Sequence, residues 1–453
     1  MEPLTLRRGG EMRVLIKDGM VITARRTGRA DVLVDGERIA RVGKIRPSAA
    51  DEVVEARGLL VLPGFIDAHV HFSLPVAGTR SADDFRTGPI AAAHGGVTSF
   101  VDFTVGHPEV SLPKALEGRL EEARPSCIDY SFRAEMVGWT PERVDEIFRV
   151  AEMGVRSFKF YTAYSDSGRR TPLGYLRVAM GAIREIGGVA MVHCEADELV
   201  DPRGGPFPSA RPAVAEEVAI AEVGILARET GCRTYIAHIS SAQGLAAYLD
   251  AKRKGALLMG ETCPHYLLLD DRVYMRPDGY LFSVTPPLRK PVDFEALWRA
   301  LGRKLLTAVS TDHCPFTRKQ KEAGAEDPTR LPSGLPGVEL LPALLFSEGV
   351  VKGRISPRQF AYYLTEGPAK AFGLWPRKGR LSRGADADLV LWDPDARWTV
   401  KTRHLHMDVD FSPYEGMELR GRAVAVMSRG KWIVREGEFI GAEGHGKFVP
   451  WQG

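Results

Sequence analysis

The sequence predicts a TIM-type (β/α)8 barrel joined to a small β-sandwich that is built from both ends of the chain. The first observation is a series of short apolar runs, each of which ends in or carries a residue able to bind a metal ion. The second is a strand-rich block at either end of the sequence. With 453 residues, the chain is long enough for two domains of this kind.

The two ends of the chain read as strands. Regular patterning begins after residues 1–11, which we predict to be an N-terminal extension. In residues 12–62 the dipeptides Asp18-Gly19 and Asp35-Gly36 separate apolar runs, and both are hairpin turn signals. Strand-like runs return in residues 378–453. Because neither block is expected to fold alone, we predict that the two combine into one β-sandwich domain with a C-terminal tail.

Residues 63–377 form the predicted barrel, and its first strand ends in the pair His69 and His71. Residues two apart on a strand point to the same face, so this pair places two imidazoles side by side at one strand end. That arrangement is typical of metal ligands. An isolated pair could equally be two surface or core histidines, so the rest of the chain has to decide.

Similar segments recur along the barrel region. Short apolar runs end in His193, His238 and Asp312, and Lys159 lies within another such run. From the histidine pair onward, in chain order, these residues follow at intervals of 88, 34, 45 and 74 residues. A TIM barrel uses roughly 31 residues per strand-helix unit, so the intervals correspond to about three, one, one and two units. The spacing therefore places all of them at the C-terminal mouth of one barrel, on strands 1, 4, 5, 6 and 8.

The composition indicates a globular protein that acts on small molecules. Hydrophobic residues make up 44% of the chain, and 61 basic against 58 acidic residues leave a net charge of only +3. No nucleic-acid or membrane surface is predicted from that balance. Five cysteines without a Cys-x-x-Cys pair favour free thiols. There is no signal-peptide pattern and no apolar run of the ~18 residues that a membrane span needs, so we predict a cytoplasmic protein.

The motifs around these residues resemble those of the amidohydrolase superfamily, and within it the dihydropyrimidinases and hydantoinases, which hydrolyse cyclic amides. The matching stretches follow family order from residue 61 to beyond residue 416. They include PGFIDAHVHF at 63–72, SFK at 157–159, HCE at 193–195, ETCPHY at 261–266, STDHCPF at 310–316 and SPYEG at 412–416. This resemblance implies the same barrel and sandwich that the spacing predicts.

The resemblance also implies a centre of two divalent metal ions, with zinc as the expected metal. Four histidines, an aspartate and a lysine exceed the three protein ligands that one catalytic zinc ion usually takes. By resemblance, His69, His71 and Asp312 hold one ion, His193 and His238 hold the other, and Lys159 bridges both. The lysine would be N6-carboxylysine, a carbamate formed with carbon dioxide. Imidazole and carboxylate ligands also accept manganese, cobalt or iron.

Catalysis and substrate binding are assigned by the same resemblance. A metal-bridging hydroxide would attack the ring carbonyl, Asp312 would take up its proton and return it to the leaving nitrogen, and Tyr164 would donate a hydrogen bond to the oxyanion and so also bind substrate. Thr285 and Ser333 stand where backbone groups of relatives contact the ring. Dihydropyrimidinases commonly carry serine and asparagine at these two positions, so the exact ring stays open.

Two further predictions concern the pocket for the ring substituent and the histidines that are not metal ligands. In relatives, the positions of Phe72, Leu74 and Tyr161 lie near loops that line the pocket for the ring substituent. Seven histidines fall outside the ligand pattern and are expected on the surface or in packing: His94, His107, His265, His313, His404, His406 and His445.

The resemblance therefore implies hydrolysis of dihydropyrimidines or hydantoins to N-carbamoyl amino acids, as in pyrimidine degradation, by a homotetramer. Allantoinase, which opens another cyclic ureide, is an alternative. Dihydroorotase is disfavoured, because that enzyme usually has an arginine where this chain has Ser73. An alternative of another class is a non-catalytic scaffold like the collapsin-response mediator proteins, which have lost metal ligands; this chain retains all six.

Overall fold

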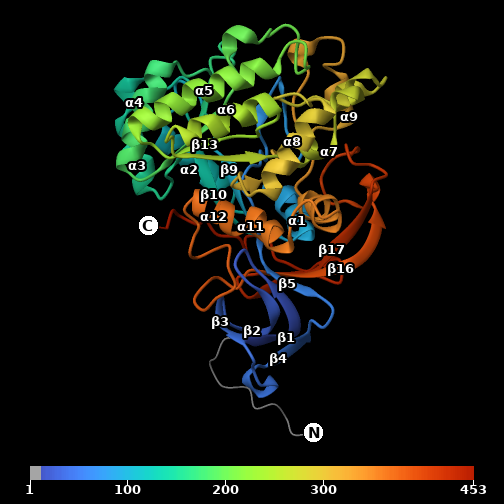
Figure 1. The fold of residues 1–453 in the computed structure, drawn as a ribbon. Helices are drawn as coiled ribbons and strands as arrows, with labels where there is room; N and C mark the ends of the chain where they lie inside the picture. The colour runs from blue at the N-terminus through green and yellow to red at the C-terminus, as the bar shows by residue number, and fades with distance from the viewer. Residues whose placement is uncertain (1–11, 453) are drawn as a thin grey trace.

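A computed structural model describes residues 12–452, and the predicted extension, residues 1–11, lies outside the described residues. The chain forms an eight-stranded parallel barrel surrounded by helices and a nine-stranded sheet made from both chain ends (Figure 1). The predicted fold class is therefore confirmed. The predicted domain boundaries near residues 62 and 378 stay predictions.

The barrel strands are neighbours in the order in which they occur in the chain, and seven of the eight adjacent pairs are joined by parallel ladders. They are β6 (Phe65–Asp67), β9 (Val97–Phe103), β10 (Asp129–Glu135), β11 (Ser157–Tyr161), β12 (Val189–His193), β13 (Thr234–Ile236), β14 (Leu258–Thr262) and β15 (Ala308–Val309). The predicted strands 1, 4, 5, 6 and 8 correspond to β6, β11, β12, β13 and β15. Most of these residues are buried on both faces, as expected for parallel strands covered by helices.

The barrel closes just beyond the last residues of β15 and β6. Val70 and His313 form a parallel bridge there, and the backbone N–H of His71 donates to the carbonyl of His313 at 2.8 Å. The segments that carry the histidine pair and Asp312 therefore lie next to each other.

Helices cover the outside of the barrel (Figure 1). They are α1 (Thr87–Gly95), α2 (Leu112–Glu122), α3 (Asp145–Glu152), α4 (Leu173–Glu185), α5 (Ala213–Thr230), α6 (Ala242–Arg253), α7 (Pro264–Leu268), α8 (Pro291–Gly302), α9 (Arg318–Glu322), α10 (Leu341–Leu345), α11 (Pro357–Leu364) and α12 (Glu366–Ala371). Ser111, Ser241 and Ser356 begin α2, α6 and α11 by accepting a backbone N–H, the usual role of serine at a helix start. Among residues 12–452, no helix combines the length and apolarity that a membrane crossing requires.

The second sheet runs in the order β19-β18-β17-β16-β5-β1-β2-β3, with β4 paired to β1. Its strands are β1 (Arg13–Ile22), β2 (Thr27–Asp35), β3 (Arg38–Gly43), β4 (Glu52–Glu55), β5 (Leu60–Pro63), β16 (Leu389–Thr399), β17 (Glu418–Ser428), β18 (Lys431–Arg435) and β19 (Glu438–Phe439). A separate two-residue pair, β7 (Pro75–Val76) and β8 (Thr79–Arg80), forms a small hairpin. The antiparallel pair β5–β16 joins the two chain ends, and Val61, Leu389 and Met427 share one buried cluster. Each end completes the core of the other.

One of the two predicted turns is wrong. The dipeptide Asp35-Gly36 does separate β2 from β3, but Asp18-Gly19 lies inside β1, at a bulge in its pairing with β2. A side chain at position 19 would place its Cβ 2.3 Å from Val61 Cγ2, so glycine is required there by close packing. The local turn signal is overridden by the neighbouring strand.

A buried cluster of charges ties the barrel, the sheet and the C-terminal tail together. Lys378 Nζ lies 2.5, 2.9 and 2.6 Å from carboxylate oxygens of Asp129, Asp386 and Asp388. Arg429 Nε donates to Asp129 Oδ1 at 2.9 Å. Burial opposes the charge of Lys378, but these aspartates hold the pKa of its ammonium above the usual value. The tail then continues along the barrel, where its residue 449 N–H donates to the residue 130 carbonyl.

We predict that Lys378→Met destabilises the protein by about 3–5 kcal/mol, because it leaves buried carboxylates without their central cation. Urea unfolding followed by circular dichroism would measure the shift of the midpoint. The matched control is Lys352→Met, which removes an exposed lysine from a helical pair with Glu348 and should change stability by no more than about 0.5 kcal/mol. Equal midpoints for the two variants would contradict the structural role of Lys378.

Candidate metal centre and substrate cavity

A cavity of about 780 Å³ opens at the C-terminal ends of the barrel strands. Its size suits a small ligand. Its lining includes all of the site residues that the sequence predicts: His69, His71, Lys159, Tyr164, His193, His238, Thr285, Asp312 and Ser333. The fold thus brings residues from five barrel strands and from two later loops to one place.

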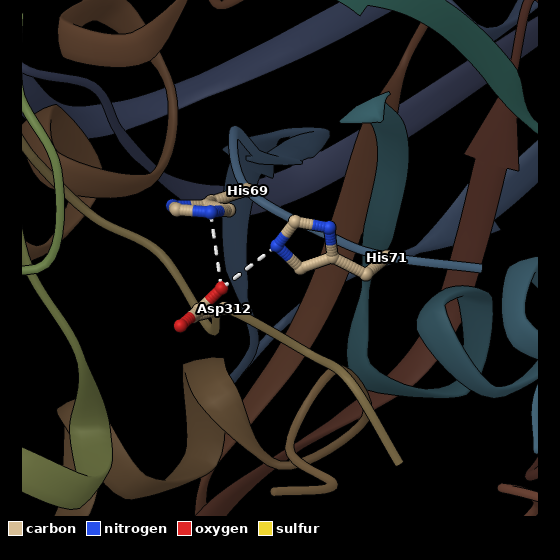
Figure 2. A group of neighbouring side chains, drawn as sticks. All are labelled: His69, His71 and Asp312. Atoms are coloured by element: carbon tan, nitrogen blue, oxygen red, sulfur yellow. Dashed lines mark hydrogen bonds and ion pairs between the residues drawn. The ribbon is translucent and has the colours of Figure 1, made fainter. Parts of the chain in front are cut away.

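The first group consists of His69, His71 and Asp312 (Figure 2). The Nε2 atoms of both histidines lie 3.0 Å from the same carboxylate oxygen, Oδ1 of Asp312. Burial raises the pKa of Asp312, but the two imidazoles outweigh burial and hold that pKa well below its usual value. Two nitrogens and an anionic oxygen therefore converge from the first and the eighth strand.

The second group consists of His193 and His238. His193 Nδ1 lies 3.0 Å from His238 Nε2. Two nitrogens that each bind one zinc ion at its usual distance, in tetrahedral geometry, are about 3.3 Å apart, so this pair has nearly the required spacing. Burial lowers the pKa of His238 well below its usual value, which keeps the imidazole neutral and its lone pair available.

Lys159 lies on β11, buried, and lines the same cavity. Its Nζ is 5.5 Å from the ring centre of Phe103 and 5.2 Å from that of Tyr161. Burial lowers the pKa of Lys159 to about 8. A substantial share of the amine is consequently neutral near physiological pH, and only the neutral form can react with carbon dioxide.

Carboxylates stand behind the imidazoles, and their role could not be read from the sequence. Glu261 Oε1, at the end of β14, lies 2.5 Å from His69 Nδ1, and its Oε2 accepts a hydrogen bond from the Tyr235 hydroxyl at 2.9 Å. Glu195 Oε2 lies 2.7 Å from His193 Nε2. Histidines that bind metals usually have such a partner on the second ring nitrogen, so the donor set fits divalent metal ions. The available signals were that Glu195 and Glu261 both lie in stretches that match the family, and that Glu261, like the ligands, follows a short apolar run.

Three of the predicted site residues have a left-handed backbone conformation, which side chains other than glycine rarely adopt. The φ angles are 72° for Tyr164, 34° for His238 and 51° for Asp312. Such conformations cost on the order of 1–3 kcal/mol each and tend to occur at functional sites. All three residues line the cavity, so this backbone strain is concentrated at the site.

The two loops predicted to bind substrate are tied to each other. The Tyr164 hydroxyl donates to Thr285 Oγ1 at 2.9 Å. Next to Ser333, the N–H of Gly334 donates to the Ser283 carbonyl at 2.9 Å. The same carbonyl accepts from the buried Lys321, 2.9 Å away. Lys321, on α9, was not identified from the sequence, where it is one of several charged residues in a short polar helix.

The remaining expectations have mixed outcomes. Leu74 and Tyr161 line the cavity as expected, but Phe72 does not, because it packs fully buried against Phe85 and Phe100. His313 points away from the ligand cluster, and its Nε2 lies 3.0 Å from Asp83 Oδ2. All five cysteines are unpaired and buried.

Comparisons with known proteins agree with this geometry. The model of the amidohydrolase family matches residues 60–433. The D-hydantoinase of Geobacillus stearothermophilus is 37% identical, covering 97% of this chain and 96% of its own, and that of Streptomyces coelicolor is 38% identical, covering 97% and 98%. The crystal structure of dihydropyrimidinase from Brevibacillus agri superimposes with a TM-score of 0.93 at 36% identity, over 97% of this chain and 99% of its own.

We predict that Glu261→Gln weakens metal binding by about 10- to 100-fold, since glutamine supports the imidazole of His69 less strongly than a carboxylate. Competition with a chelating dye would measure the dissociation constants. The matched control is Glu339→Gln, which alters a buried glutamate paired with His406 outside the cavity. Equal metal affinity in both variants would remove Glu261 from the metal centre.

Proposed function

Because this chain belongs to the amidohydrolase family, we propose that it is a metal-dependent hydrolase that opens the ring amide of hydantoins and dihydropyrimidines. The products would be N-carbamoyl amino acids. The observation that carries the proposal is the meeting of five imidazole and carboxylate donors with a buried lysine in one cavity. Relatives named for this activity match almost the whole chain, which supports the same chemistry here.

The metal centre that we propose has two divalent ions, with zinc as the first candidate. His69, His71 and Asp312 would hold one ion, and His193 and His238 the other. Lys159 would bridge them as a carbamate, formed when its neutral amine adds to carbon dioxide and loses a proton. When bound, the ions would make a hydroxide available near neutral pH and polarise the ring carbonyl.

The other residues have roles that follow from their positions. Asp312 would accept a proton on its carboxylate and return it to the leaving ring nitrogen. The Tyr164 hydroxyl, now bound to Thr285 Oγ1, would turn to the oxyanion of the substrate and stabilise its charge. Backbone groups at Thr285 and Ser333 would hold the ureide, in loops that the hydrogen bond from the Gly334 N–H to the Ser283 carbonyl joins.

We further propose a cytoplasmic homotetramer. The five free, buried cysteines suit a reducing compartment, where disulfides are rare. Measurement of the mass in solution by light scattering would test the oligomeric state.

The function is tested by initial rates of ring opening on dihydrouracil, hydantoin, a 5-substituted hydantoin, allantoin and dihydroorotate, with one zinc-loaded preparation. We expect hydantoin or dihydrouracil to be opened fastest. Activity on allantoin alone would identify an allantoinase instead. Failure to open any of the five with metal bound would refute the proposal, and a protein that stays metal-free in zinc-replete medium would support the scaffold alternative.

We predict that Lys159→Ala loses most of its bound metal and nearly all activity, because no anion remains to bridge the two ions. Small carboxylic acids such as propionate should restore part of the activity by taking the place of the carbamate. Metal content by elemental analysis and carbon-13 NMR after exposure to labelled bicarbonate would both report on the lysine. The control is Lys252→Ala, a partly buried lysine on α6 that donates to the Leu258 carbonyl. Full metal content and activity in Lys159→Ala would disprove the bridging role.

A further inference from the structure

One cation in the wall of the cavity has no partner. Arg169, half-buried on the loop between β11 and α4, lines the cavity. Within residues 12–452, its guanidinium takes part in no hydrogen bond or ion pair, and its nearest described aromatic contact is Tyr161, with the ring centre 5.9 Å from Cζ. The other arginine of the lining, Arg211, is bound to Glu195 through Nε and Nη2.

Carboxylates near Arg169 are engaged elsewhere. Glu135 accepts the Tyr161 hydroxyl on Oε1 at 2.6 Å and the Gly106 N–H on Oε2 at 2.8 Å. Asp197 accepts from Ser165 and Arg170. Asp166, on the same loop, is exposed, so water and salt screen its charge. Burial lowers the pKa of Arg169, but Tyr161 and Glu135 outweigh burial and raise that pKa, so the charge is partly balanced. The N–H donors of the guanidinium nevertheless have no acceptor among residues 12–452, which leaves them available to a ligand in the cavity.

The neighbouring wall is apolar. Leu74 and Cys314 are buried together with Phe316, and Val76 packs against them. Leu74, Val76 and Cys314 all line the cavity, as does Arg169. The cavity thus combines apolar side chains with a guanidinium that has no hydrogen-bond partner among residues 12–452, and this combination suits a short aliphatic stem that ends in an anion.

We infer that the preferred substrates are cyclic ureides whose ring carries a carboxylate at the end of a short aliphatic stem, with Arg169 binding that carboxylate. This inference rests on the proposed function and narrows it to one substrate class. A guanidinium pairs with a carboxylate through two parallel hydrogen bonds, which gives geometric selection as well as attraction. An uncharged substituent of the same shape would leave Arg169 unpaired.

The test compares 5-(2-carboxyethyl)hydantoin with 5-(2-carbamoylethyl)hydantoin, which have the same shape and differ in charge. With the metal-loaded protein, we expect kcat/KM to favour the carboxylate by about tenfold or more, mainly through a lower KM, because the pair forms equally in the ground and transition states. The preference should shrink as salt is raised.

In Arg169→Gln the ratio of the two kcat/KM values should fall close to one, and Arg169→Lys should retain part of the preference. The matched control is Arg177→Gln, an arginine on α4 that is bonded to Glu229, and neither of these two residues lines the cavity. That variant should keep the preference of the parent protein. Should Arg169→Gln fail to fold, the inference is tested by the ratio of the two kcat/KM values in the parent protein and by the dependence of that ratio on salt.

The two proposals fail in different ways. Equal rates for the two hydantoins, or faster opening of the carboxamide, would overturn the carboxylate inference while ring opening itself stands. If Arg169→Gln still prefers the carboxylate, another group binds that carboxylate, and the role of Arg169 is overturned. No opening of either compound, of unsubstituted hydantoin or of dihydrouracil, with metal bound, would overturn the proposed function.

Discussion

The closure of the barrel between its first and eighth strands is the constraint on which the site depends. β6 and β15 are only three and two residues long, and backbone pairing between them is confined to the segments that follow. A side chain adds to this backbone pairing. The two carboxylate oxygens of Asp67 accept the N–H and the hydroxyl of Thr311 at 3.1 and 2.5 Å. Since His69 and Asp312 come directly after these residues, the same contacts that close the barrel set the distance between the ligand atoms.

Electrostatics divides the barrel mouth into two parts. Toward the barrel axis, buried carboxylates such as Glu261 and Glu195 stand behind imidazoles, and Arg211 neutralises Glu195. This ordering makes the nitrogens that face the cavity better donors to a cation. The same cavity is lined by Arg169, whose guanidinium makes no hydrogen bond or ion pair within residues 12–452, and by the apolar side chains Leu74 and Val76. The imidazole and carboxylate groups suit metal cations, whereas Arg169 suits an anionic substituent. A metal ion and an anionic substituent can therefore bind in one cavity without competing for the same residues.

The substrate side of the cavity is built from loops that regular structure alone does not position. Ser283 joins the loops that carry Thr285 and Ser333, because its carbonyl accepts the Gly334 N–H and its hydroxyl donates to the Pro332 carbonyl, both at 2.9 Å. Lys321 donates to the same carbonyl and hydroxyl of Ser283. A lysine with no exposed surface is costly to bury, and here its hydrogen bonds go to backbone and hydroxyl groups rather than to a carboxylate. The cost is consistent with a requirement for fixed loop geometry at the cavity.

The sequence by itself determined the barrel, the joining of the two chain ends and the strands that carry His69, Lys159, His193, His238 and Asp312. These depend on the two-residue period of a strand and on the length of a strand-helix unit, and both properties are local. Tertiary structure alone decided that Asp18-Gly19 forms a bulge, that Phe72 packs in the core, and that Glu261 supports His69 from 192 positions away. It also decided that the guanidinium of Arg169 has no hydrogen-bond or ion-pair partner among residues 12–452. A side chain's direction follows from its own strand, whereas its neighbours across a closed barrel follow from the packing of all eight strands.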